Sequence, residues 1–153
     1  MPDDALYQSI AQRYGFHLPD EHREMSARGF FKLDHPSHAS EFTSLANSYL
    51  WLNDMEWYSL QEIADFTFPD IYEPHLPNLV PFAFNGAGDY WCLQTDKTDE
   101  RGTRVLLCPH DYALARIYAP SFPAALYRQV LEYACYGTDF DRDRGQNRAF
   151  LHR

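Results

Sequence analysis

Residues 78–95 read NLVPFAFNGAGDYWCLQT, and this stretch decides the fold. Within 78–84 a large apolar residue stands at every second position, which is typical of one face of a β-strand. The segment 85–88 predicts a tight turn, because glycine tolerates positive φ. Residues 89–95 predict a second strand, so the stretch as a whole predicts an antiparallel hairpin. Pro81 lacks a backbone N–H and therefore predicts a sheet edge or a bulge.

Further strands are predicted on both sides of this hairpin. A polar hairpin over 96–102 leads to an expected strand at 104–108, and aromatic-rich segments predict strands at 48–52 and 55–58. Because consecutive strands are joined mostly by short turns, we expect them to pair in antiparallel fashion. The pattern predicts a mainly antiparallel sheet of about five strands.

Helices are predicted before, between and after these strands. Ser59 and Glu62 form a capping box, in which each side chain can bind the backbone N–H of the other residue. Together with the strands, the helices define an α+β fold with helices packed on the sheet. The predicted helices cover residues 4–14, a segment with Pro19 in its first turn and Gly29 as its stop, residues 60–66, and a segment from Phe122, capped by Ser121, to a stop at Gly137.

The charge of the chain is negative and unevenly distributed. The 153 residues include 22 acidic and 13 basic ones, which gives a formal charge of −9. No Lys or Arg occurs between Lys32 and Lys97, whereas ten carboxylates fall in residues 33–96. A protein that binds the phosphate backbone needs a basic surface, so the composition argues against a nucleic-acid partner.

The length and composition are typical of one domain, which we expect over residues 1–137, followed by a charged tail at 138–153. No apolar run approaches the ~20 residues of a membrane helix, and the first residues do not resemble a signal peptide. Cys92, Cys108 and Cys135 are odd in number and widely spaced, which favours reduced thiols. We therefore expect a cytoplasmic protein without a membrane partner.

Catalytic and metal-binding patterns are weak. The seven histidines form no ligand cluster of zinc spacing, and no cofactor motif is present, so we expect neither a metal nor a cofactor. Cys108 and His110 would share one face of a strand, but no orienting residue can be assigned to them. Paired carboxylates near three tryptophans leave a small carboxylate-dependent hydrolase as an alternative. The acidic, aromatic middle of the chain otherwise indicates a surface for a basic protein.

Four local motifs, taken in order, resemble the SUKH superfamily, the Smi/Knr-like domain. They read YGFHLP at 14–19, WYSLQEI at 57–63, LVPFA at 79–83 followed by NGAGDYWCL at 85–93, and SF at 121–122. The resemblance implies a SUKH-like fold and structural roles for the residues that carry the motifs. Those residues are Leu18, Pro19, Trp57, Pro81, Phe82, Gly86, Gly88, Asp89 and Phe122.

The resemblance also implies a binding module without catalysis. Bacterial members are commonly immunity proteins that neutralise a cognate polymorphic toxin, often a nuclease. An intracellular regulatory or scaffold protein of the same type is the alternative. A nuclease presents a basic cleft, so an acidic surface fits it. We expect a monomer or weak homodimer whose surface for the toxin domain includes Asp54, Glu56, Glu62, Asp65, Asp70 and Glu73.

Overall fold

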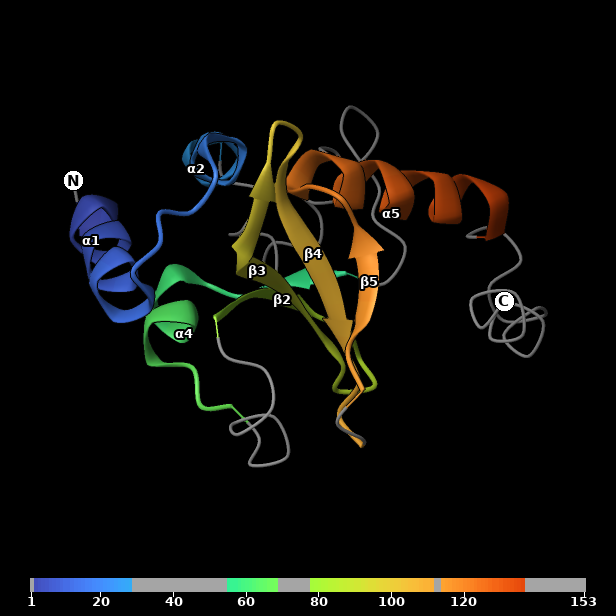
Figure 1. Cartoon of the computed structure of the whole chain (residues 1–153), viewed down its shortest axis with the longest axis horizontal. Coiled ribbons are helices and arrows are strands. Elements are labelled where there is room, and N and C mark those ends of the chain that lie inside the picture. Colours follow the sequence, from blue (N-terminus) through green and yellow to red (C-terminus); the bar gives the residue numbers. More distant parts are fainter. Residues whose placement is uncertain (1, 29–54, 69–77, 112–113, 137–153) are drawn as a thin grey trace, which may run out of the picture.

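The computed structural model describes residues 2–28, 55–68, 78–111 and 114–136 of the chain (Figure 1). These residues form an α+β domain, as the sequence predicts. In chain order its elements are α1 (Pro2–Tyr14), α2 (Asp20–Ala27), β1 (Glu56–Trp57), α4 (Leu60–Asp65), β2 (Leu79–Phe84), β3 (Tyr90–Asp99), β4 (Gly102–Cys108), β5 (Arg116–Ala119) and α5 (Phe122–Tyr136).

The five strands form one antiparallel sheet in the order β1-β2-β3-β4-β5. The predicted hairpin at 78–95 is confirmed as β2 and β3. The predicted polar hairpin at 96–102 is confirmed, but its turn is limited to Glu100 and Arg101, because β3 continues to Asp99 and β4 starts at Gly102. The sequence did not predict β5, and the strand expected at 48–52 lies outside the described residues.

Pro81 lies on β2 and is paired with Cys92 of β3, while the pairing of β2 with β1 covers only Ala83 and Phe84. Strand β2 pairs with β1 on one side and with β3 on the other, and the register of the second pairing shifts between Pro81 and Ala83. The shift is the bulge that a proline requires within a sheet, because its nitrogen cannot donate a ladder hydrogen bond. Of the two predicted settings, the bulge is confirmed.

The helix ends follow local sequence signals. Gly15 ends α1 at φ 60°, in the left-handed region that glycine tolerates. Pro19 is the N-cap of α2 and not a residue of its first turn. Ser59 and Glu62 form the predicted capping box of α4, and Ser121 accepts a hydrogen bond from the backbone N–H of Ala124 at the start of α5. The stops expected at Gly29 and Gly137 lie outside the described residues.

Apolar side chains cover both faces of the sheet. The larger core joins α1, α2, α4 and α5 to one face, and Phe82, Trp91 and Phe122 are almost fully buried in it. A smaller cluster on the other face contains Cys92 and Cys108 together with Leu79, Tyr90 and Leu106. The helices α1, α2 and α4 gather at one end of the sheet, while α5 extends beyond β5 at the opposite end (Figure 1).

Candidate protein-binding surface

The end of the domain formed by α1, α2 and α4 is acidic. These helices and their caps carry seven carboxylates against the three guanidinium groups of Arg13, Arg23 and Arg28. Strands β2–β5, their described turns and α5 carry six carboxylates against five Lys and Arg. The negative charge of the described residues is therefore concentrated on one end of the domain, which we call the acidic helical end.

The structure describes three of the six predicted partner-binding residues. Glu56, Glu62 and Asp65 are exposed; the last two lie on α4, and Glu56 lies on β1, the edge strand that precedes it. Glu62 and Asp65 are thus brought together on one short helix. The other three predicted residues, Asp54, Asp70 and Glu73, lie outside the described residues.

Helix α4 is held by both of its ends. At its start the backbone N–H of Ser59 donates to Glu62 Oε2 at 2.7 Å, and the N–H of Glu62 donates to Ser59 Oγ at 3.2 Å. At its end the guanidinium of Arg13 donates to the carbonyl oxygens of Ala64 and Phe66. These bonds satisfy groups that a six-residue helix leaves open, so its carboxylates stand on a fixed support.

A second contact between α1 and α4 strengthens this support. The hydroxyl of Tyr14 donates to the carbonyl oxygen of Ile63 at 2.7 Å. Burial raises the pKa of Tyr14 to about 12, because the ionised form would lose its solvent, so the hydroxyl remains a donor at neutral pH. Asp65 in turn accepts a hydrogen bond of 2.5 Å from Gln61 Nε2 on the surface of α4.

Helix α2 contributes acidic residues that the sequence analysis did not select. Asp20 and Glu21 occupy its first turn and are exposed, and Glu24 follows one turn later in an ion pair with Arg28 at 2.6 Å. Carboxylates in the first turn also interact favourably with the helix dipole. The enrichment of Asp and Glu directly after Pro19 was the available sequence signal, but only the fold places α2 beside α1, where His22 meets Tyr7.

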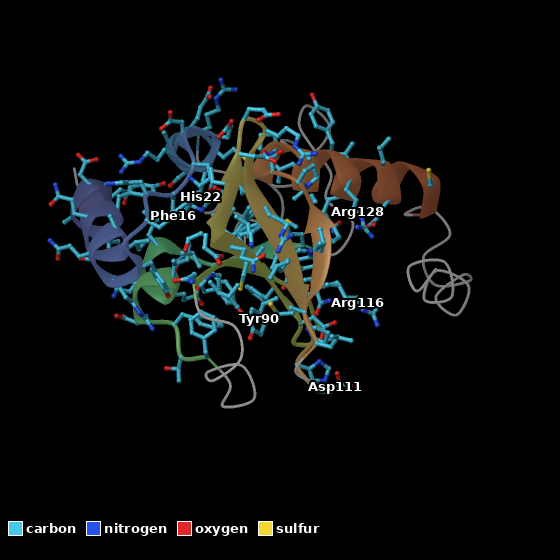
Figure 2. The ribbon with its side chains drawn as sticks, viewed as in Figure 1. Phe16, His22, Tyr90, Asp111, Arg116 and Arg128 are labelled. Carbon is cyan, nitrogen blue, oxygen red and sulfur yellow. The ribbon has the colours of Figure 1, made fainter. Side chains whose placement is uncertain are left out.

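His22 anchors α2 to the core beneath these carboxylates. Its side chain is fully buried, and its ring makes edge-on contacts with Tyr7 and Trp57 and a tilted contact with Phe122 (Figure 2). The Tyr7 hydroxyl lies 3.4 Å from His22 Nδ1. Burial, with a smaller contribution from the cation of Arg23, lowers the pKa of His22 to about 3. The imidazole is therefore neutral at physiological pH.

The residues of the family motifs lie mainly in the core and its turns. Leu18, Trp57, Phe82 and Phe122 are buried together in the larger core. The segment 85–89 forms the turn between β2 and β3. In this turn Asn85 Oδ1 accepts hydrogen bonds from the backbone N–H groups of Ala87 and Asp89, each at 3.0 Å. Gly86 and Gly88 lie in the same turn, and Asp89 closes it.

The candidate Cys–His pair is not assembled as a nucleophile. Cys108 is buried in the smaller cluster, whereas the His110 side chain is half exposed and its Nδ1 lies 2.7 Å from Asp89 Oδ1. Cys92 lies beside Cys108, and burial followed by that neighbour raises the pKa of the Cys92 thiol well above its usual range. Both buried cysteines are thus placed as packing residues.

The described carboxylates lie in a different environment from the carboxylate pair that a hydrolase requires. Such an enzyme needs one carboxylate in an apolar pocket that keeps it protonated. Glu56, Glu62 and Asp65 are instead exposed. Among the described residues no group of three or more His, Cys, Asp or Glu is placed to hold a metal ion. Within the same ranges, no helix has the length and apolar character needed to cross a membrane.

Comparison with known proteins gives one match. The model of a family described as SMI1 / KNR4 family (SUKH-1) matches residues 1–128 of the chain. The match covers every described element up to the first half of α5. The searches of curated proteins and of solved structures gave no match.

Proposed function

Because the chain belongs to the SMI1 / KNR4 family (SUKH-1), we propose that it is a non-catalytic protein-binding module, an immunity protein that neutralises a cognate toxin. The toxin domain binds through a basic surface, such as the substrate cleft of a nuclease. The acidic helical end of this chain occupies that cleft and blocks it. The observation that supports this proposal is the concentration of carboxylates on α1, α2 and α4.

Electrostatics favours the acidic helical end over the rest of the domain as the surface that binds a basic partner. Seven carboxylates against three guanidinium groups produce a negative field that accelerates encounter with a basic partner. The remaining described elements are close to neutral and offer no comparable field. The fixed position of α4 and the buried anchor of α2 mean that little ordering is needed on binding, which lowers its entropic cost.

The test needs the C-terminal domain of a secreted multidomain toxin encoded beside the gene of this protein. Its association rate with the chain should fall steeply between about 50 and 200 mM salt, since screening shortens the range of the charges. The double variant Glu56→Lys/Asp65→Lys should associate at least about tenfold more slowly at low salt. Association that does not depend on salt would contradict the electrostatic part of the proposal.

A charge-matched control is available outside the three acidic helices. Asp96→Lys/Glu100→Lys changes the net charge by the same amount at exposed positions of the β3–β4 hairpin. This variant should change the association rate less than about threefold, because the local field and not the net charge steers the partner. If both double variants slow association equally, the binding surface is not the acidic helical end.

Glu62→Gln separates folding from binding. Glutamine also serves as the third residue of a capping box, so α4 should remain folded without the negative charge. We expect an unchanged melting temperature and slower association with the toxin domain. If no toxin domain binds the wild-type chain and an endogenous intracellular protein binds instead, the regulatory or scaffold role replaces the immunity role.

A further inference from the structure

A group of aromatic side chains lies on the sheet face that bears the smaller cluster. In the described part of the chain, no residue of α1, α2, α4 or α5 belongs to this cluster. Several of its rings are half-buried and keep part of their surface in contact with solvent. They are Tyr58, Phe66, Phe68 and Phe84. We call these four side chains the aromatic surface.

The rings of the aromatic surface form a continuous chain of contacts. Tyr58 lies 4.7 Å from Phe84 and 5.3 Å from Phe66, measured between ring centroids. Phe66 in turn lies 4.8 Å from Phe68, and both contact the buried ring of Tyr90 (Figure 2). Rings that hold one another in place lose little side-chain entropy when a partner binds, and aromatic anchors carry much of the energy of protein interfaces.

Glu56 lies beside the aromatic surface. It pairs with Phe84 across β1 and β2, and paired residues of an antiparallel sheet project to the same face. Tyr58 follows two positions later in the chain and packs against the same cluster. The Glu56 side chain is exposed and makes no hydrogen bond or ion pair with the described residues. Its carboxylate is therefore available to a partner.

The surroundings of these rings are negatively charged. Burial is the main cause that raises the pKa of Tyr58 to about 12, and the carboxylate of Glu62 adds to this effect, so Glu62 lies near the ring. Residues 56–66 also include Asp65 but no Lys or Arg. Arg13 reaches this segment, where two backbone carbonyl oxygens at the end of α4 accept hydrogen bonds from its guanidinium. Three carboxylates against one guanidinium leave the aromatic surface in a negative field.

From these observations we infer that the aromatic surface receives an arginine side chain of the basic partner, with the guanidinium held between the rings and the carboxylate of Glu56. The inference rests on the proposed function and adds the point at which the partner is anchored. The faces of aromatic rings carry partial negative charge, so the rings and Glu56 attract the same cation. An acidic side chain would be repelled by both.

Other occupants fit this combination less well. An apolar side chain would cover the rings but would leave the Glu56 carboxylate desolvated and without a partner, which costs free energy. Lysine would supply the charge as a compact ammonium group. Arginine is favoured over lysine, because its planar guanidinium stacks on a ring while its N–H groups remain free to bind a carboxylate.

An arginine probe tests the site without a toxin domain. N-acetyl-argininamide, added to the full chain up to about 100 mM at constant ionic strength, should shift the amide NMR signals of residues 56–58 and Phe84 more than those of Asp20 and Glu21. The neutral isostere N-acetyl-citrullinamide should cause less than about a third of these shifts, because it keeps the shape and loses the charge. Equal shifts from the two probes, or equal shifts on α2 and at the aromatic surface, overturn the inference.

Two variants separate the charge from the ring. Glu56→Gln removes the charge of an exposed side chain, and Phe84→Leu replaces the ring with another apolar side chain. Each should weaken binding of the arginine probe at least about threefold. Glu21→Gln is the matched control, because Glu21 is also exposed but lies on α2, and it should change the affinity less than about 1.5-fold. If Phe84→Leu does not fold, Glu56→Gln decides; an equal loss in Glu21→Gln and Glu56→Gln contradicts the inference.

A toxin domain separates this inference from the proposed function. Phe84→Leu keeps every charge, so it should leave the association rate within about twofold and raise the dissociation rate at least about tenfold. If association with wild type depends on salt but Phe84→Leu dissociates at the wild-type rate, the proposed function stands and the inference fails. If no toxin domain binds, the proposed function fails, and the arginine probe alone decides whether the aromatic surface binds a guanidinium group.

Discussion

One oxygen of Asp89 holds His110 at two points. Asp89 Oδ1 accepts a hydrogen bond of 3.0 Å from the backbone N–H of His110 and lies 2.7 Å from its Nδ1. Asp89 closes the turn between β2 and β3, and His110 follows β4. The contact therefore ties together two connections at the same end of the sheet. The aspartate of the NGAGD motif therefore joins two connections of the sheet in addition to closing its own turn.

The first prediction concerns the pKa values of this pair. The hydrogen bond to Asp89 raises the pKa of His110 above 6.5, and the negative charges of Asp89 and Asp111 add to this effect. Asp89→Asn should lower the pKa of His110, as measured by NMR titration of the imidazole. Asp111→Asn should lower it less, because Asp111 contributes charge alone. An equal effect of the two variants would show that the short contact does not set the pKa.

The same pair predicts how stability depends on pH. The contribution of His110 to the free energy of unfolding is fully present below pH 6.5, and it is lost as the pH rises through the raised pKa of this histidine. Partial burial opposes ionisation of Asp89, but hydrogen bonds from the side chain and backbone of His110 and from Asn85 lower its pKa below 3.8. The contribution of Asp89 to the free energy of unfolding is therefore present above pH 3.8, and it is lost as the pH falls through the lowered pKa of this carboxylate. The difference in unfolding free energy between wild type and Asp89→Asn should thus be largest between pH 3.8 and 6.5.

The second prediction compares two glycines of the turn. Gly88 has a φ of 93°, and an added Cβ would lie 3.6 Å from the Cβ of His110. Gly86 has open space around it and a φ that other residues adopt. Gly88→Ala should therefore lower the free energy of unfolding by about 1–2 kcal/mol through backbone strain, whereas Gly86→Ala should change it by less than about 0.5 kcal/mol. Urea unfolding of both variants measures the contrast, and equal effects would show that strain at Gly88 is not the cause.

The third prediction concerns His22. Its pKa of about 3 in the folded chain lies below the value of 6.5 expected when it is unfolded. The unfolded chain thus binds a proton first, so the stability contribution of the neutral imidazole is present above pH 6.5 and lost as the pH falls towards 3. One proton corresponds to a slope of about 1.4 kcal/mol per pH unit.

Urea unfolding between pH 7 and pH 4 measures this slope. His22→Gln removes the titration and keeps a polar side chain, so its stability should fall less steeply with acid than that of wild type. The difference should reach roughly 2–3 kcal/mol between pH 6.5 and pH 4.5. Parallel pH profiles of the two proteins would assign the acid sensitivity to carboxylates and not to His22.

The fourth prediction concerns Trp57. Its side chain is 5% exposed and contacts the rings of Phe82 and Phe122 at centroid distances of 5.9 Å. Trp57→Ala should lower the free energy of unfolding by about 3–5 kcal/mol, because the cavity cannot close within a packed aromatic cluster. Tyr127→Ala serves as the control, since Tyr127 is 72% exposed and its loss should cost less than about 0.5 kcal/mol. Equal losses of stability in the two variants, measured by thermal unfolding, would contradict the core position of Trp57.

Local sequence signals predicted the parts of the fold that depend on neighbouring residues. The capping box of Ser59 and Glu62, the end of α1 at Gly15 and the hairpin at 78–95 were all predicted and are confirmed. Each depends on residues within a few positions of one another, or on one φ value that glycine tolerates. The α+β class and the family motifs followed from the order of these signals.

Strand β5 is an element that local sequence signals could not predict. Its four residues, RIYA at 116–119, are too few for a periodic pattern, and they become a strand by pairing with Val105, Leu106 and Leu107 of β4. The acidic helical end is similar. The sequence analysis selected Glu62 and Asp65 from the span without Lys or Arg, but it did not select Asp20 and Glu21, which belong to a different part of the chain.

By itself, the sequence determined the class of the fold, the main hairpin, the helix caps and the family of this protein, because turn chemistry, capping and side-chain alternation act over a few residues. The tertiary structure decided which charges share a surface, that His22 is buried against Trp57, and that Asp89 holds His110. These relationships join residues far apart in the chain. They arise only when burial of a common core fixes where distant elements meet.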